Sequence, residues 1–486
     1  MALRRLLIPA VCALNIIVFG AVSAPAAEPE KEKAVAKHRT DWFKDAQWGV
    51  FTHYLTGAKT PAEAWNQQVD KFDVAGLVKQ LEAAGARYYV ITLGQNSGHF
   101  CAPNAAYDRI AGIRSLSKCA RRDLVADLHA ALAPKGIKLM LYLPCQTPNA
   151  DPRAQKAFGL PEGARDQPLD EVFARKWAEV IHDWSSRYGD RVVGWWFDGG
   201  YAHIRFNEAI ARIYADAVKR GNPDAIVTFN PGVKLVRYTQ TEDYTAGEIN
   251  EPQNVECAGR WVGTSQWHML SYLGPSWCAS PPRFSNEQVI EMTRGIIESE
   301  GVVTWDVPIQ PSGLIPEPFA AQLVALRKGL AEPLAATAPV PPGNLAYRKR
   351  AKLLDVTGTK ALDVNSGKYF ARLGVDGDPA TKAHAGGEWP WTFHVDLGAS
   401  HPVNRVVITF DPKCFATEYK VNLSVDGRTW TTVAHMKGAT GGKPEHTFAA
   451  TPARYVRIQA LKPDGPNQEG QQMGIQELEV YAEGGK

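Results

Sequence analysis

Between residues 72 and 93, two hydrophobic patterns with different periods follow one another. In FDVAGLVKQLEAAGARYYVITL, four apolar residues recur at the spacing of one helical face: Val74, Leu77, Val78 and Leu81. Asp73 is placed to cap the start of this helix and Gly85 to end it. The run RYYVITL then has the continuous apolar character of a buried strand. The stretch therefore predicts a helix, a glycine turn and a strand.

The same order of helix and strand recurs in four later stretches: 123–143, 176–197, 211–230 and 289–305. Repeated units of this kind predict a parallel sheet covered by helices. With QWGVFTH as the first strand, six strands can be counted, and the poorly patterned region 231–285 has room for more. A domain of this length, 35–331, favours a (β/α)8-type (TIM-like) barrel over an open sheet. No GxGxxG motif follows the first strand, which disfavours dinucleotide binding.

The pattern changes after residue 331. Residues 332–343 are rich in alanine and proline and have no period, as expected of a linker. Residues 344–484 then contain short alternating stretches such as WTFHVDLG and YKVNLSVDGRTWTTV, with turn residues between them. This second pattern predicts an all-β sandwich.

The first residues have the composition of a secretory signal peptide. Arg4 and Arg5 precede a short apolar core, and small residues near position 25 offer a cleavage site, so residues 1–27 are interpreted as a signal peptide. The alternative, an uncleaved membrane anchor, is disfavoured because the apolar core is short. No later segment is long and apolar enough to span a bilayer. We therefore expect an exported protein, either periplasmic or secreted.

The bulk composition limits the kinds of partner and metal that the protein is expected to bind. The 486 residues carry a net charge of only +3, and no basic stripe is visible, so nucleic acid is not an expected partner. Removal of the signal peptide leaves six cysteines, an even number that permits disulfides without identifying the pairs. No CxxC or clustered Cys/His spacing predicts a transition-metal site. The sequence leaves the oligomeric state open.

The candidate chemistry lies where the predicted strands end, because these ends form the active-site mouth of a parallel barrel. One carboxylate, Asp198, follows the apolar strand VVGWWF and precedes two glycines. The other strand ends supply polar and aromatic groups: His53, Tyr54, Gln95, Asn96, His99, Asn230 and, after GVVT, Trp305 and Asp306. Such groups around a carboxylate suit a sugar pocket.

Trp196 is a candidate for stacking on the sugar. The alternatives are a turn cap for Asp198, a core position for His53, a loop anchor for His99 and barrel packing for Trp196.

Five ordered blocks resemble the α-L-fucosidases of glycoside hydrolase family 29. They are DWFKDAQWGVFTHYL, AAGARYYVITLGQNSGHF, RRDLVADLHAALAPKGIKLMLYL, VVGWWFDGG and TWDVPIQPSGLIPEPFAAQLVALRKGL, and they cover about residues 40–330. The resemblance implies that Asp198 is the nucleophile of a retaining mechanism and that His53 contacts the sugar. The first block departs from the family's His-Trp-Gly at Tyr54 and Leu55. The second lacks the family's paired histidines and offers Gln95, Asn96 and His99 instead.

Retaining hydrolysis needs a second carboxyl group, about 5–5.5 Å from the nucleophile. Candidates occur in TQTEDYTAGEINEPQNVE. Glu248 is the first choice, because DYTAGE resembles a family segment with an acidic residue at that point. Glu251 is the second choice, and Glu242 or Asp243 follow; a solvated acidic loop is the alternative for each. A family Trp-Glu segment also aligns with Trp267-His268, which makes His268 a further candidate contact.

The second domain resembles discoidin, or F5/8 type C, domains, a group that includes carbohydrate-binding modules of the CBM32 type. The resemblance places four residues where such domains hold a structural Ca²⁺: Asp376, Asp378, Thr381 and Glu477. Oxygen ligands suit this cation, and an ordinary Asx-rich turn is the alternative.

Together these features predict an exported, retaining exo-glycosidase similar to α-L-fucosidases. It would act on a terminal fucose or related sugar of a glycan, without an organic cofactor. The alternative is a catalytically degenerate barrel that only binds carbohydrate.

Overall fold

The computed structural model describes residues 38–113, 117–146, 150–160, 168–255, 257, 259–332, 342–355, 357–358, 371–384, 391–462 and 473–482. The predicted signal peptide, 1–27, lies outside the described residues, as does most of the predicted linker, 332–343. Among the described residues, no helix combines the length and the apolar character needed to cross a bilayer. The six cysteines that the structure describes, from Cys101 to Cys414, all carry free thiols.

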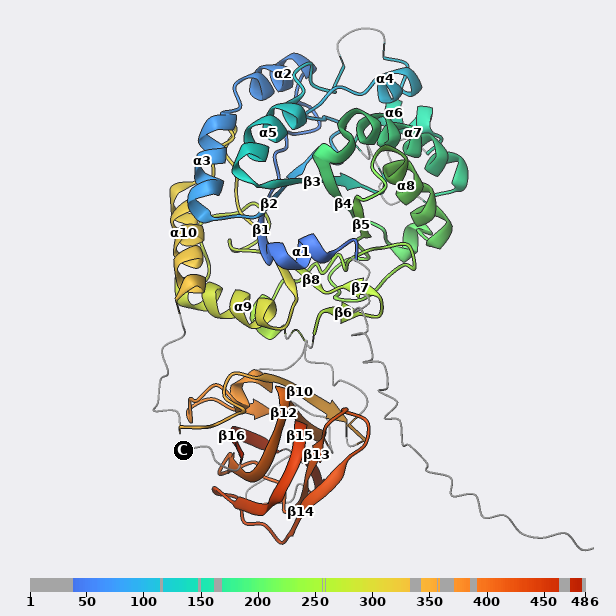
Figure 1. The fold of residues 1–486 in the computed structure, drawn as a ribbon. Coiled ribbons are helices and arrows are strands. Elements are labelled where there is room, and N and C mark those ends of the chain that lie inside the picture. The colour runs from blue at the N-terminus through green and yellow to red at the C-terminus, as the bar shows by residue number, and fades with distance from the viewer. Residues whose placement is uncertain are drawn as a thin grey trace, which may run out of the picture. The chain divides into compact units, whose positions relative to one another are not determined.

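A parallel sheet of seven strands forms the centre of the first domain (Figure 1). The strand order is β5-β4-β3-β2-β1-β9-β8, and every pairing along it is parallel. The strands are β1 (Trp48–Thr52), β2 (Tyr88–Thr92), β3 (Lys138–Pro144), β4 (Val192–Asp198), β5 (Ile226–Phe229), β8 (His268–Tyr272) and β9 (Val302–Asp306). The predicted TIM-like class is confirmed.

Residues 243–249 lie between the two ends of this sheet. The Asp243 N–H donates to the Val227 carbonyl of β5, and Glu248 forms a parallel bridge with Leu270 of β8. A short antiparallel pair, β6 (Trp261–Val262) and β7 (Ser265–Gln266), precedes β8. The segment thus occupies the place of an eighth strand without the regular pairing of one.

Helices surround the strands, as the apolar periodicity predicts (Figure 1). They are α2 (Ala62–Asp70), α3 (Val74–Ala84), α4 (Ala105–Ile110), α5 (Leu124–Leu132), α6 (Pro152–Phe158), α7 (Glu171–Tyr188), α8 (Glu208–Gly221), α9 (Asn286–Glu298) and α10 (Glu317–Ala331). The predicted start and stop signals of α3 are confirmed. At the start, the Asp73 side chain accepts from the Gly76 N–H, and at the end Gly85 adopts a left-handed conformation with φ of 71°.

The space enclosed by the strands is filled with aromatic side chains. Short helix α1 (Asp41–Ala46) closes the amino-terminal end of the strands, where Phe43 packs against Tyr88, Tyr244 and His268. Further along the strands the interior contains a layer of buried residues: Phe51, Val90, Met140, Tyr142, Trp196 and Leu270. The interior is therefore a packed core, as in other barrels of this class, where the active site lies at the carboxyl ends of the strands.

The second domain is antiparallel. Its sheet has the order β11-β16-β12-β15-β13-β14, with β10 paired to β12. The strands are β10 (Arg350–Asp355), β11 (Ala383–His384), β12 (Trp391–Phe410), β13 (Glu418–Ser424), β14 (Thr431–Lys437), β15 (Glu445–Lys462) and β16 (Gly474–Ala482). Register shifts interrupt the long strands β12 and β15. Alternate residues of β12 are buried, beginning with Trp391, Phe393 and Val395. The predicted all-β sandwich is confirmed.

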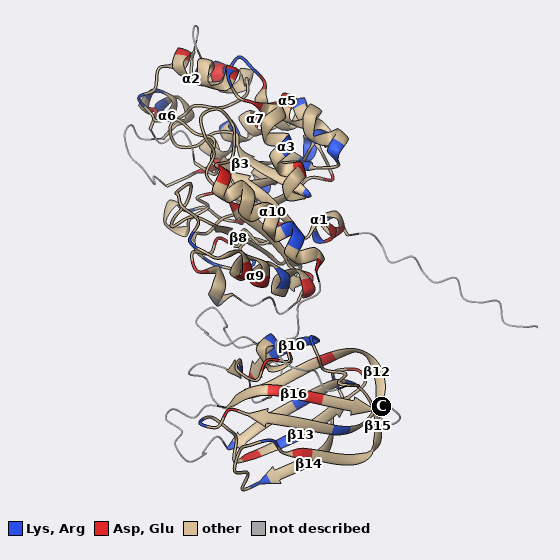
Figure 2. Ribbon diagram, turned by 90° about the vertical axis from the view of Figure 1, so that its left-hand side faces the viewer, with Lys and Arg blue, Asp and Glu red and all other residues tan. Residues whose placement is uncertain are grey.

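Figure 2 shows acidic and basic residues interspersed on its strands and on the barrel helices.

Gly247 fixes the segment between β5 and β8, and its substitution tests the fold. A Cβ at this position would lie 1.9 Å from the His268 carbonyl oxygen, and φ is 61°. We expect Gly247→Ala to lower the free energy of unfolding by about 3 kcal/mol or more. The midpoint of thermal unfolding would then fall by roughly 5–10 °C.

Gly136→Ala is the matched control, because φ is 68° there and nothing lies within 4 Å of the added Cβ. We expect this variant to lose only about 1 kcal/mol. Equal destabilisation of the two variants would contradict the assigned contact between residues 247 and 268.

Candidate active site

The candidate site forms where three neighbouring segments of the sheet end. Asp198 is the last residue of β4 and lies opposite Pro144 of β3 in the strand register. Asn230 directly follows β5, whose Phe229 lies opposite Phe197. Because these carboxyl ends share one edge of a parallel sheet, the side chains of Asp198 and Asn230 meet.

Three donors fix the half-buried carboxylate of Asp198. The Tyr142 hydroxyl donates to Oδ2 over 2.5 Å, the Asn230 amide donates to Oδ1 over 2.9 Å, and the Gly199 N–H donates to Oδ1 over 2.8 Å. Burial and the nearby Asp198 charge raise the pKa of the Tyr142 hydroxyl well above its ordinary value, so it remains a donor. Donors that converge in this way hold a carboxylate ionised and in one orientation.

The same Asn230 nitrogen also donates to Glu248 Oε2, over 2.5 Å. Since one nitrogen contacts an oxygen of each residue, those two carboxylate oxygens are no more than about 5.5 Å apart, a separation that matches a retaining glycosidase pair. The Gly232 N–H donates to Asn230 Oδ1 over 3.1 Å, so the amide nitrogen is directed toward the two carboxyl groups. Asn230 is therefore a bridge between Asp198 and Glu248.

Glu248 is half-buried, and its surroundings favour the protonated form. Burial raises the pKa of its carboxyl group above the ordinary value. The Asn230 hydrogen bond acts against this effect, the charge of Asp198 adds to it, and His53 opposes it. The two carboxyl groups thus differ in environment: Asp198 accepts three hydrogen bonds, whereas Glu248 is a desolvated acid beside a negative charge.

His53 lies at the same mouth, just after β1. Its Nδ1 is 2.8 Å from Asp306 Oδ1, and the ring packs against Phe51, Tyr142 and Trp277. Burial alone would lower the pKa of His53, but Asp306 and Cys278 raise it to about 10. The neighbouring Asp306 therefore favours the cationic form of His53.

Gln95 and Asn96, both half-buried, are the other predicted contacts found near this mouth. The Gln95 side-chain amide donates to the Tyr142 hydroxyl over 3.0 Å, which extends the chain of hydrogen bonds that ends on Asp198. The carbonyl of Asn96 accepts from the Ala150 N–H.

The structure corrects four predicted sugar contacts. Tyr54 is buried and donates to the carbonyls of Gln68 and Pro311, so its hydroxyl is used within the fold. His99 is buried beside the ring of Trp65. Trp196 is buried beneath Tyr142 and donates to the Ala246 carbonyl.

The fourth correction concerns His268, which begins β8 and therefore lies at the amino-terminal end of the strands. Its ring nitrogens contact the Thr245 carbonyl and the Thr304 hydroxyl, over 2.9 and 2.7 Å. Burial lowers its pKa to about 4. His268 is a neutral core residue at the opposite end from Asp198.

The other acidic candidates do not join Asp198. Glu251 is exposed and accepts from the Gln253 side chain. Glu242 is buried and accepts from the Tyr238 N–H. Asp243 pairs with Arg39 and Lys219, at 2.9 and 3.1 Å.

Sequence reasoning missed Tyr142, and it listed Asp306 only as a strand end. Tyr142 is the one hydroxyl-bearing residue in the apolar strand KLMLYLP, and its position two residues before the strand end was the available signal. Asp306 ends the buried strand VVTWD, as Asp198 ends VVGWWFD. The resemblance of these two strand ends could have identified Asp306.

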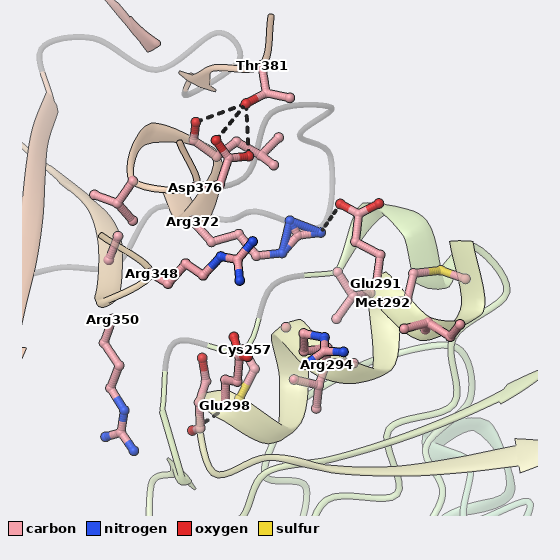
Figure 3. A pocket seen from close by; sticks show the side chains of 18 of the residues that line it. Cys257, Glu291, Met292, Arg294, Glu298, Arg348, Arg350, Arg372, Asp376 and Thr381 are labelled. Atoms are coloured by element: carbon pink, nitrogen blue, oxygen red, sulfur yellow. Dashed lines mark hydrogen bonds and ion pairs between the residues drawn. The ribbon is translucent and has the colours of Figure 1, made fainter. Parts of the chain in front are cut away.

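The four predicted calcium ligands lie in two segments of the sandwich. The Thr381 hydroxyl lies 2.9 and 3.1 Å from the two Asp376 carboxylate oxygens, as Figure 3 shows, and the Asp378 N–H donates to Asp376. The Gly377 N–H donates to Glu477 Oε2. Glu477 Oε1 is buried and has no hydrogen-bond partner among the described residues. Clustered carboxylates with an unsatisfied buried oxygen fit a hard cation.

A model of the α-L-fucosidase family matches residues 59–330, more than half of the chain. The chain belongs to this family. A second model, an F5/8 type C domain described as a NedA-like, galactose-binding domain, matches residues 373–458.

Comparison with solved structures gives three informative likenesses. A Bacteroides thetaiotaomicron structure described as an α-L-fucosidase is 17% identical, with 92% of this chain and 97% of that chain covered and a TM-score of 0.48. A fucose complex of a variant family 29 fucosidase from Ruminococcus gnavus is 15% identical, with coverages of 91% and 94% and a TM-score of 0.42.

The third is chitosan-binding module 1 of a chitosanase/glucanase from Paenibacillus sp. IK-5. It is 29% identical, covers 29% of this chain and 100% of that module, and has a TM-score of 0.25. Comparison with curated proteins finds no match. The family assignment rests on the α-L-fucosidase model.

Asn230→Ala tests the bridge between Asp198 and Glu248. The substitution removes two hydrogen bonds to carboxyl groups, each worth about 1.5–3 kcal/mol. We expect kcat/KM for an aryl α-L-fucoside to fall by about 100-fold or more.

Asn222→Ala is the matched control. Asn222 is a buried asparagine that donates to the Val192 carbonyl at the start of the same strand, β4, and it should lose stability while keeping activity. An Asn230→Ala enzyme with kcat/KM within about threefold of the parent would contradict the bridging role.

Proposed function

We propose that the protein is an exported exo-α-L-fucosidase that hydrolyses a terminal fucose, or a closely related sugar, with retention of configuration. The single observation that carries this proposal is the shared contact of Asn230 with Asp198 and Glu248. The two contacted oxygens are no more than about 5.5 Å apart, and such closeness supports the carboxyl spacing of a retaining rather than an inverting enzyme.

In the first step, an Asp198 oxygen attacks the anomeric carbon while the bond to the leaving oxygen breaks. Glu248 donates its proton to that oxygen, so the aglycone departs as a neutral alcohol. In the second step, the Glu248 carboxylate takes a proton from water, whose oxygen attacks the anomeric carbon and releases Asp198. Glu248 is protonated again, and both residues return to their starting state.

The two environments suit these roles. Tyr142 and Asn230 donate to Asp198 and orient it, and the raised pKa of Glu248 favours the protonated form that a leaving group needs. His53 would offer its Nε2–H to a sugar hydroxyl, since Nδ1 contacts Asp306, and Gln95 and Asn96 follow β2 where the family has its paired histidines. No step requires an organic cofactor.

Export is supported by the amino-terminal pattern of residues 1–27. Calcium in the sandwich is supported by Asp376, Asp378, Thr381 and Glu477, which gather oxygen ligands around one turn. The cation would fix that turn and would take no part in hydrolysis.

Azide rescue tests the two catalytic roles. An Asp198→Ala enzyme should lose activity on an aryl α-L-fucoside by about 10³-fold or more, and azide should restore turnover with β-L-fucosyl azide as product. A Glu248→Ala enzyme should instead give α-L-fucosyl azide, because azide then attacks the glycosyl-enzyme. NMR of the products distinguishes the two anomers.

Glu251→Ala is the matched control, because Glu251 is exposed and should be dispensable. Glycan binding without turnover by the unmodified protein would instead support the catalytically degenerate barrel. Rescue of Glu251→Ala, rather than Glu248→Ala, would contradict the assignment of the acid/base.

Calcium should stabilise the sandwich. At 100 times its Kd the cation would add about 2.7 kcal/mol, which raises the thermal midpoint of that domain by roughly 5–10 °C. A chelator should reverse the shift, and Glu477→Gln should abolish it. Asp426→Asn is the control, because Asp426 caps a turn in the same domain through the Arg428 and Thr429 N–H groups and should keep the response. An unchanged midpoint with and without Ca²⁺ would contradict the site.

A further inference from the structure

Asp306 is a buried carboxylate beside the candidate active site. It is the last residue of β9, which lies between β1 and β8 in the sheet, and its side chain is 1% exposed. Its two oxygens have different partners. Oδ1 lies 2.8 Å from His53 Nδ1, and Oδ2 accepts the Cys278 N–H over 3.1 Å. Both oxygens are engaged, so the carboxylate has one orientation.

A carboxylate that is removed from water needs a compensating charge. Within the described part of the chain, His53 is the only cationic side chain that forms an ion pair with Asp306. The backbone N–H of Cys278 adds a dipole and no net charge. The contact between Asp306 Oδ1 and His53 Nδ1 therefore orients the ring, and an adjacent carboxylate favours the imidazolium form of His53.

The position of His53 makes this charge relevant to the substrate. Its ring lies beside Tyr142, whose hydroxyl donates to Asp198, and its charge reaches Glu248. The groups that face His53 come from four parts of the fold: Phe51 on β1, Tyr142 on β3, Asp306 on β9, and Trp277 with Cys278 after β8.

We infer that Asp306 is a positioning residue that holds His53 protonated, so that Nδ1–H donates to Asp306 and Nε2–H is a permanent donor at the sugar site. A neutral histidine can present either a donor or an acceptor, according to its tautomer. A histidine held by Asp306 presents only donors, and so selects a sugar oxygen that accepts a hydrogen bond. Asp306 also anchors the loop that carries Trp277 against the His53 ring. This role deepens the proposed function and rests on it.

The first test measures the protonation of His53 directly and needs no substrate. In ¹⁵N NMR of the full-length protein, with His53→Gln used to assign the signal, His53 should remain an imidazolium through pH 9. The side chain in Asp306→Asn has nearly the same shape. In this variant His53 should lose its proton at or below about pH 6.5, the ordinary pKa of a histidine. Titration of His53 in the ordinary range in the unmodified protein would overturn the inference, and so would identical titrations in both proteins.

The second test measures the consequence for hydrolysis. Asp306→Asn should lower kcat/KM for an aryl α-L-fucoside by about 10- to 100-fold, with a larger loss at pH 8 than at pH 5, where the variant's His53 can still be protonated. Asp243→Asn is the matched control, because Asp243 is a largely buried barrel carboxylate paired with Arg39 and Lys219. It should leave kcat/KM and its pH dependence unchanged.

A loss in Asp306→Asn that is the same at every pH, or no loss at all, would overturn the positioning role. If the unmodified protein hydrolyses no glycoside, the proposed function fails. The NMR titration then still decides whether Asp306 holds His53 as a cation.

Discussion

One amide nitrogen holds two carboxyl groups at the mouth of the barrel, and the site depends on this contact. Two charges about 5 Å apart repel by roughly 3 kcal/mol at an effective dielectric constant of 20, so two ionised groups would separate or change their protonation. Asn230 donates to both groups, and burial favours the neutral form of Glu248. The shared donor reduces the repulsion between the two groups, and burial raises the pKa of Glu248, which favours its protonated form.

Two regular strands and one irregular segment position this pair. Asp198 and Asn230 follow regular strands, but Glu248 lies in a segment that has only bridge contacts with β8. Gly247 allows this segment to approach the His268 carbonyl closely. On the other side of the mouth, Asp306 and His53 form a second pair of opposite charge. The Asp198–Glu248 pair and the Asp306–His53 pair thus lie at the same end of the sheet.

The sequence predicted the parts of the molecule that follow a period or a strand-end rule. Helix α3 was predicted from its apolar spacing and its caps from Asp73 and Gly85. Asp198 and Asn230 were predicted as site residues because they follow apolar strands. Glu248 came from a family resemblance, because segment 243–249 has no period of its own. The hydrogen bonds that join these residues were not predictable, since they depend on register between strands that are distant in sequence.

The incorrect site predictions have a common physical cause. Tyr54, His99 and Trp196 lie near strand ends, but side chains there alternate between the mouth, the interior and the helical layer. His268 begins a strand that had no recognisable pattern, so its end of the barrel could not be assigned. The pairing of Asp306 with His53 was not predictable, because it depends on β9 lying beside β1, which only the sheet order supplies.

The stereochemistry of hydrolysis tests the central claim most directly. During the first minutes of reaction with an aryl α-L-fucoside, ¹H NMR should show α-L-fucose before mutarotation produces the β anomer. Initial release of β-L-fucose would mean that water attacks the sugar directly, and would contradict a nucleophile and an acid held together by Asn230.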